Sequence, residues 1–166
     1  MASLIWKLTE TLLGLLLICV VLINVVNSTS RHLLSVSITG ADELMVFIVI
    51  FVVMAGSVYA LANRRHIAID LLPSVLSGKS LTLLRIVHDV AILSATLFAA
   101  LASWNFVGKI SQIGTVSMSL GVPMAIPHSA VFLGFTGMAL VAAVLLYRDV
   151  RLLLKGNISD TRTSGP

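Results

Sequence analysis

Four long stretches of this sequence contain no Asp, Glu, Lys or Arg. They cover residues 11–30, 44–63, 90–108 and 110–147, and are 20, 20, 19 and 38 residues long. An α-helix rises about 1.5 Å per residue and a bilayer core is about 30 Å thick, so about 20 residues can cross it. The fourth stretch is too long for one span, and Pro123 and Pro127 divide it because a helix interior rarely accommodates proline. The sequence therefore predicts an all-α membrane protein with four transmembrane helices.

We expect these spans near residues 8–30, 42–63, 85–108 and 128–148. They would form a single four-helix membrane domain over residues 1–155, followed by a flexible cytoplasmic tail at 156–166. Only 11% of the residues are charged, against about 25% in a typical globular domain, and the longest segment between charge-free stretches has 26 residues. There is no room for a soluble catalytic domain, and no phosphate loop, Ser-His-Asp set or metal-ligand spacing occurs. We therefore predict no enzyme activity and no catalytic, cofactor-binding or metal-binding residue.

The basic residues predict the orientation of the spans. The N-terminus, the second loop and the tail together hold nine Lys and Arg residues, whereas the first and third loops hold only Arg31 and Lys109. Cytoplasmic loops carry the excess of Lys and Arg, so both termini and the second loop are expected inside. Basic residues at one membrane face suit anionic lipid headgroups, and no nucleic-acid partner is needed to explain them. The first apolar run is expected to be retained as a span, because no small-residue cleavage site closes it.

Two connecting segments differ from ordinary loops. In residues 66–78, apolar side chains fall on one helical face and polar ones on the other, which is typical of a short helix in the inner headgroup layer. A half-apolar loop is an equal alternative there. Residues 110–129 are apolar but interrupted by glycine and proline, so we expect them at the outer interface, either covered by a partner or placed shallowly.

The predicted spans themselves have two notable properties. Pumps and ion-coupled carriers place ionisable residues deep in the bilayer. Here the charged residues, Asp89 and Asp149 among them, lie at span ends or between spans, where we expect water or headgroups to solvate them. We therefore do not expect this chain to translocate a charged solute alone. Small residues allow helices to approach closely in lipid. They recur every four positions in three of the spans: Gly56 and Ala60 in the second, Ala130 and Gly134 in the fourth, and a longer ridge in the third. The third-span ridge consists of Ala91, Ala95, Ala99 and Ser103.

Three motifs carry a family resemblance. The first is Arg31 after the first span, followed by Asp42 and Glu43 opening the second, with His32 where an aromatic residue is usual. The second is the run from Ala60 to Asp70, which contains Arg64-Arg65-His66-Ile67 and has Ile69 where valine is commoner. The third is Pro123-Met124 followed by Ile126-Pro127, with Ala125 replacing a tryptophan. Together these motifs resemble the small, DctQ-like membrane subunit of tripartite ATP-independent periplasmic (TRAP) transporters.

The resemblance implies a complex in the bacterial inner membrane. A large membrane subunit would bind sodium and an organic anion, such as a C4-dicarboxylate or a sialic acid, and a periplasmic substrate-binding protein would deliver the anion. The small subunit would be a scaffold in contact with lipid and with both partners. Nothing in the sequence chooses between the anions.

The resemblance also suggests which residues contact partners. Arg31, Asp42 and Glu43 are candidates at the periplasmic surface, and Arg64, His66 and Asp70 at the inner end of the second span. Pro123 and Pro127 are candidates at the entry to the fourth span. Helix capping and snorkelling at the interface are equally good explanations of these charged residues.

Two other functions are compatible with the pattern. The chain has four histidines, which could ligate haem in a four-helix electron-transfer subunit. His32 in a polar loop and His66 at a helix end are poor positions for such ligands. A structural protein or assembly factor with four spans is the second alternative.

Overall fold

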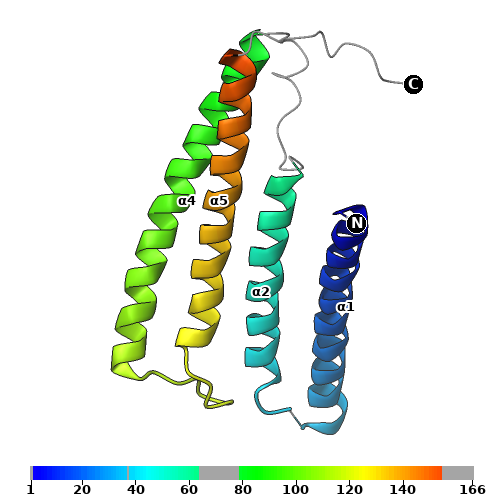
Figure 1. Cartoon of the computed structure of the whole chain (residues 1–166). Coiled ribbons are helices and arrows are strands. Elements are labelled where there is room, and N and C mark those ends of the chain that lie inside the picture. The colour runs from blue at the N-terminus through cyan, green and yellow to red at the C-terminus, as the bar shows by residue number, and fades with distance from the viewer. Residues whose placement is uncertain (1, 37, 64–78, 155–166) are drawn as a thin grey trace, which may run out of the picture.

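The computed structural model describes residues 2–36, 38–63 and 79–154, and almost all of them are helical. The helices are α1 (Ala2–Leu34), α2 (Ala41–Ala62), α4 (Lys79–Ile113) and α5 (Ala125–Leu154) (Figure 1). Each is long and apolar enough to cross a membrane. The predicted all-α fold with four such helices is confirmed. The predicted interfacial helix at 66–78 and the tail at 156–166 lie outside the described residues.

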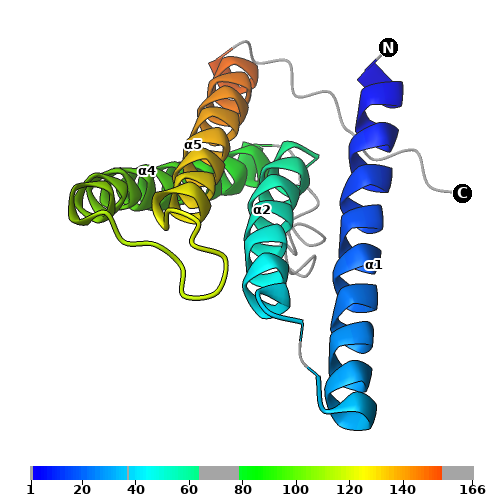
Figure 2. The same ribbon diagram turned by 90° about the horizontal axis from the view of Figure 1, so that it is seen from below.

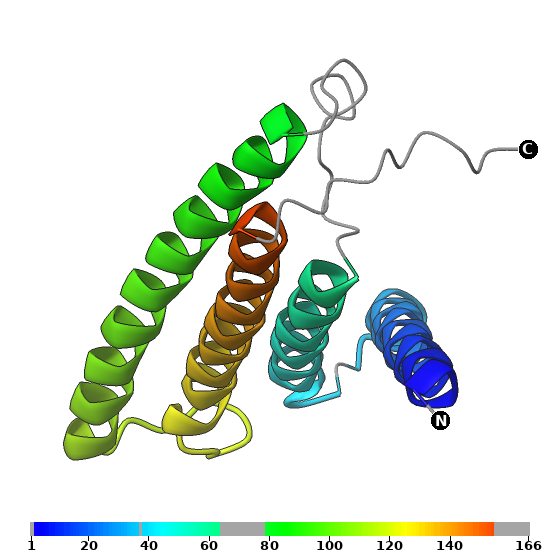
Figure 3. The ribbon, with the colours of Figure 1, turned by 45° about the horizontal axis from the view of Figure 1, so that its top comes forward.

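The helices form an open layer in the order α1, α2, α5, α4. The main contacts join α1 to α2, α2 to α5 and α5 to α4, and Figures 1 and 3 show the same order. Figure 2 shows that α4 is strongly inclined to α1. The layer does not close into a bundle, so α1 and α4 each have one main neighbour. The fold therefore leaves both edge helices largely uncovered.

The two ends of the layer are built differently. α1 begins and α5 finishes at one end, while the α1–α2 connection and the loop between α4 and α5 lie at the other (Figure 1). We call this second end the hairpin end, after the loop at residues 114–124. The sequence prediction that both termini face the cytoplasm would place the hairpin end outside the cell.

The small buried core lies between α2, α4 and α5. It is centred on Leu61, Met138, Ala142 and Leu145. The small residues of the fourth span act there as expected, because Gly134 is buried against α2. A Cβ atom added at Gly134 would lie 2.6 Å from Sδ and 2.7 Å from Cβ of Met54. Glycine is therefore required at this crossing.

The small-residue ridge of the third span is only partly used. Ala91 and Ala95 are exposed, and Ala99 and Ser103 are half-buried. α4 instead packs through neighbouring positions, where Thr96 and Ala100 are buried and Ile92 and Leu93 join the core. A repeat of four residues drifts around a helix with 3.6 residues per turn, which explains why the ridge does not stay on the contact face.

Two acidic residues are buried between α4 and α5, where the sequence predicted solvated positions at span ends. Asp89 is 3% exposed and Asp149 is 5% exposed. Nδ1 of His88 lies 3.9 Å from Oδ1 of Asp89, and both aspartates take part in further polar or electrostatic interactions. The expectation of solvation was wrong because α4 begins before its apolar run and α5 continues beyond its own. Both residues therefore lie within long helices and not at helix ends.

Candidate partner interface

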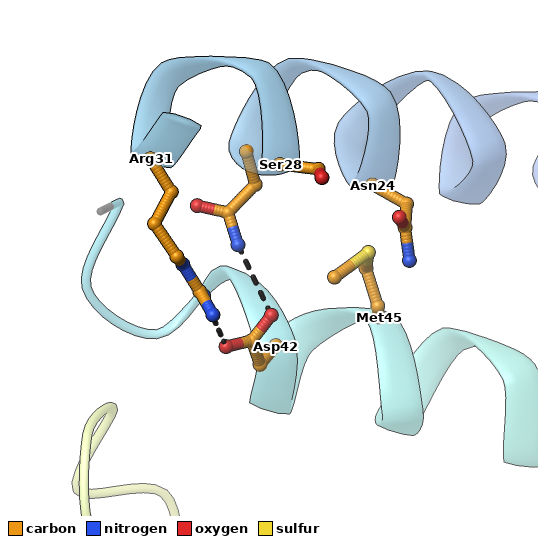
Figure 4. A pocket seen from close by; sticks show the side chains of 6 residues that line it. Asn24, Ser28, Arg31, Asp42 and Met45 are labelled. Atoms are coloured by element: carbon orange, nitrogen blue, oxygen red, sulfur yellow. Dashed lines mark hydrogen bonds and ion pairs between the residues drawn. The ribbon is translucent and has the colours of Figure 1, made fainter. Parts of the chain in front are cut away.

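Asp42 is the centre of a polar network that joins α1 to α2 at the hairpin end. Nδ2 of Asn27 donates to Oδ1 of Asp42 at 3.0 Å, and Nη2 of Arg31 donates to Oδ2 at 3.1 Å. Asn27 and Arg31 are one turn apart on α1 and so present their side chains to the same part of α2. Figure 4 shows Arg31 reaching across to Asp42. Both oxygens of this carboxylate therefore hold the two helices together.

Asn27 is the buried member of the network. Asn27 is only 2% exposed. Its Oδ1 accepts the backbone N–H of Ile38 at 3.1 Å. One amide thus ties α1 to the chain entering α2 and to Asp42. Arg31 and Asp42 remain accessible, with side chains 57% and 69% exposed. A pocket of about 230 Å³ lies beside the network and is lined by Asn24, Asn27, Ser28, Arg31, Asp42 and Met45 (Figure 4).

Glu43 performs a different task from its neighbour Asp42. Its Oε1 accepts the backbone N–H of Ser119 and its Oε2 accepts that of Leu120, both at 3.0 Å. A bidentate carboxylate on two successive amides is a strong, charge-assisted arrangement. Glu43 therefore connects the first turn of α2 to the loop between α4 and α5.

That loop is a short hairpin over residues 114–124. Ser117 donates its N–H to the carbonyl of Val122 at 2.8 Å, and Met124 donates to the carbonyl of Thr115 at 2.9 Å. The hydroxyl of Ser117 also accepts the N–H of Val122. Backbone pairing and Glu43 together give the hairpin a defined shape.

Gly40 allows the hairpin to approach α2. It precedes α2 with a φ of 84°, and an added Cβ would lie 2.5 Å from Cδ2 and 2.9 Å from Cγ of Leu120. A side chain here would suffer both the left-handed backbone and the collision. The close approach of Leu120 to Gly40 complements the carboxylate of Glu43.

We expect Gly40→Ala to lower the stability of the folded chain more than Gly114→Ala. Gly114 also has a positive φ, of 69°, but nothing lies within 4 Å of its added Cβ. The Gly114 variant should therefore show only the backbone penalty, about 1–2 kcal/mol, and the Gly40 variant the contact with Leu120 in addition. Thermal unfolding of both purified variants in detergent measures the difference. Equal losses would contradict the proposed packing of Leu120 on Gly40.

A comparison with known protein families identifies the family of this chain. Residues 17–152 match the family described as tripartite ATP-independent periplasmic transporters, DctQ component. The chain belongs to this family. The match runs from the second half of α1 to Leu152, two residues before the end of α5, and it includes the Asp42 network and the hairpin. A search of curated proteins gives no match.

Membership in the DctQ family confirms the resemblance drawn from the three motifs. DctQ proteins are the small permease subunits of TRAP transporters, where they work with a large DctM subunit and a substrate-binding protein. The chain is thus a transporter component, and its four long apolar helices indicate a multi-pass membrane protein.

The structure brings some of the predicted residues of this DctQ subunit together. Arg31 and Asp42 form an ion pair at 3.1 Å, whereas Glu43 is bound to the hairpin. Pro123 lies in the hairpin and pairs with Val116 in an isolated β-bridge. Pro127 is buried in the first turn of α5, where proline removes no helical hydrogen bond. Arg64, His66 and Asp70 lie outside the described residues.

Sequence reasoning missed three residues of this region. Asn27 lies one turn before Arg31, so the shared helix face was a usable signal. Gly40 directly precedes the acidic pair, and a glycine before a helix can indicate a close approach. No sequence signal pointed to Leu120, because its contact with Gly40 depends on how the hairpin folds back.

The haem alternative gains no support for this DctQ subunit. The ring of His128 packs against Phe106 with centroids 4.8 Å apart, and His88 lies beside Asp89. In the described part of the chain, no group of three or more His, Cys, Asp or Glu side chains could hold a metal ion. The family match is to a transporter component.

Proposed function

We propose that this chain is the small permease subunit of a sodium-coupled TRAP transporter that imports an organic anion across a bacterial inner membrane. A C4-dicarboxylate or a sialic acid is the expected class of anion. In this proposal the chain is a scaffold for the large subunit and helps to dock the periplasmic binding protein. The open helical layer is the observation that carries the scaffold role.

The edge helices of the layer supply the argument for a large partner. None of the most apolar part of α1 is buried within the chain, and large apolar side chains such as Val21 and Leu22 are more than half exposed. On α4, Phe98 and Trp104 are 76% and 61% exposed. Apolar exposure suits lipid as well as protein, but an open layer can also present a broad face to another subunit. A closed bundle of four helices would offer a much smaller face.

The charge distribution supports a role without a transport site. Between residues 44 and 62 of α2, and between residues 90 and 108 of α4, there is no charged side chain. The buried Asp89 and Asp149 lie beyond the charge-free parts of α4 and α5. Ion-coupled carriers bind their ions near the middle of the membrane. We infer that sodium and the anion bind to the large subunit.

Orientation links the hairpin end to the periplasm. The nine-to-two distribution of Lys and Arg favours cytoplasmic termini, and α1 begins at the same end of the layer where α5 finishes (Figure 1). With cytoplasmic termini, the Asp42 network and the hairpin would face the periplasmic binding protein.

Copurification tests the scaffold role. The full chain, tagged at its C-terminus, is expressed with the large subunit and extracted in mild detergent. We expect a complex that contains both subunits and that persists through size-exclusion chromatography. Recovery of this chain alone, or only with further copies of itself, would favour the structural protein with four spans instead.

A further inference from the structure

The pocket beside the Asp42 network carries both charges in its wall. Arg31 supplies a guanidinium, Asp42 a carboxylate and Ser28 a hydroxyl, and all three line the same hollow between α1 and α2 (Figure 4). The volume of about 230 Å³ is several times the roughly 30 Å³ that one water molecule occupies in the liquid, so a larger polar group fits. The two charges of the wall cancel, which suits a group that itself carries one positive and one negative charge.

Much of the hydrogen-bonding capacity around this pocket is unused. Arg31 has five N–H donors, and within the described residues only its Nη2 donates to the protein. The hydroxyl of Ser28 makes no hydrogen bond there. The buried amide of Asn27 has two N–H groups, and one of them donates to Asp42. Donors in apolar surroundings need acceptors, and a phosphate group accepts several charge-assisted hydrogen bonds at once.

The pocket lies where the hydrocarbon of a membrane meets the headgroups. Asn27 falls near the end of the charge-free stretch at residues 11–30, and Arg31 directly follows that stretch. Toward the middle of the same helix, apolar side chains such as Val21 and Val25 are more than half exposed. A ligand with a polar head in the pocket and apolar chains along α1 matches both parts of this surface. Such a ligand is a membrane lipid.

The charges of the wall favour one kind of phospholipid headgroup. An anionic headgroup would meet the carboxylate of Asp42, whose side chain is accessible. A choline group carries no N–H and so cannot donate to that carboxylate, whereas a primary ammonium has three donors. A phosphate joined to a primary ammonium satisfies both charges, with the phosphate against Arg31 and the ammonium against Asp42.

We propose that this pocket binds the headgroup of phosphatidylethanolamine and that the bound lipid helps to hold α1 against α2. The inference requires the chain to lie in a membrane, but it does not depend on transport. It also holds whichever face of the membrane the hairpin end occupies. It gives Arg31 and Asp42 a ligand in addition to their contact with each other.

Native mass spectrometry of the purified full chain tests this site. The delipidated chain in mild detergent is titrated with phosphatidylethanolamine, phosphatidylcholine or phosphatidylglycerol with the same acyl chains. We expect one phosphatidylethanolamine to bind about tenfold more tightly than either other lipid, because only this headgroup makes both charge-assisted contacts. Its binding should also raise the unfolding temperature of the chain.

Soluble compounds distinguish a lipid from a free headgroup. Glycerophosphoethanolamine and inorganic phosphate are titrated under the same conditions. Both should bind much more weakly than the lipid, because they lack the acyl chains that lie along α1. If glycerophosphoethanolamine bound as tightly as the lipid, the ligand would be a free phosphate compound and the proposal would be wrong.

Two substitutions separate the two charges of the site. Arg31→Gln should weaken binding of phosphatidylethanolamine about tenfold, as for the loss of a hydrogen bond to a charged group. Asp42→Asn should abolish the preference over phosphatidylcholine and strengthen binding of phosphatidylglycerol, because the repelling carboxylate is gone. A mere loosening of the two helices would weaken all three lipids alike and would contradict the proposal.

Lys7→Gln is the matched control. It also removes one exposed positive charge from α1, but at the opposite end of the helix, and it should leave all three affinities unchanged. Equal losses in Arg31→Gln and Lys7→Gln would overturn the inference. The bound lipid should persist when the large subunit is added. Its displacement would mean that a protein side chain fills the pocket in the complex, and this result would overturn the inference too.

Discussion

Gly134→Leu is expected to separate α2 from α5 and cause a large loss of stability. Even a single added carbon would lie 2.6 Å from Sδ of Met54 and 2.7 Å from its Cβ. The Cβ atom of Met54 is bonded directly to the backbone of α2, so no side-chain rotation can move it away from the new side chain on α5. The helices must therefore move apart, at a cost of about 3 kcal/mol, the upper end of the usual range for overpacked contacts. Thermal unfolding of the purified chain in detergent measures this loss.

The position of this contact makes its loss more serious. The contact between α2 and α5 is the main link between the two halves of the layer, α1 with α2 and α4 with α5. If this link is lost, the layer no longer presents one continuous face, so the variant should also copurify poorly with the large subunit. Gly14→Leu is the control, since nothing lies within 4 Å of a Cβ atom at Gly14. If both variants unfold like the parent, the close helix crossing at Gly134 is wrong.

Asn27→Leu is expected to loosen the connection between α1 and α2. Leucine has a similar volume but cannot accept the N–H of Ile38 or donate to Asp42. Removing one partner from a buried hydrogen bond costs about 1–3 kcal/mol. We expect a lower unfolding temperature and greater proteolysis of the connection after α1.

Asn24→Leu provides the comparison for this prediction. Asn24 lies one turn earlier on α1 and lines the same pocket, but it is exposed and has no side-chain hydrogen bond within the described residues. Its replacement should leave stability unchanged or raise it. Equal destabilisation by both variants would mean that the polar face of α1 acts as a whole and that the buried amide of Asn27 has no special role.

The number and type of helices could be predicted from sequence because they depend on local properties. Charge-free runs of about 20 residues must be helical in lipid, where backbone groups need partners within the segment. How the helices associate was harder to predict, since apolar burial gives no preference between neighbours in a membrane. The ridge from Ala91 to Ser103 was therefore detected, but the exposure of Ala91 and Ala95 was not predicted.

In the candidate interface, too, the residues could be predicted from the sequence but their contacts could not. Arg31, Asp42 and Glu43 stood out as charges beside apolar runs, and the family motif singled them out together. Their different tasks depend on contacts between residues far apart in the chain, such as Glu43 with Ser119. The burial of Asp89 and Asp149 was not predicted, because both helices continue past their charge-free stretches and the length of such a stretch does not show where a helix ends.

Reconstituted uptake tests the central claim most directly. Liposomes with a sodium gradient receive the large subunit and the binding protein with this chain, the same two proteins without it, or this chain alone. Radiolabelled anions are screened first with the complete set. We predict sodium-dependent accumulation only when all three proteins are present. Accumulation by this chain alone, or undiminished accumulation in its absence, would contradict the claim that it is a necessary scaffold without a transport site.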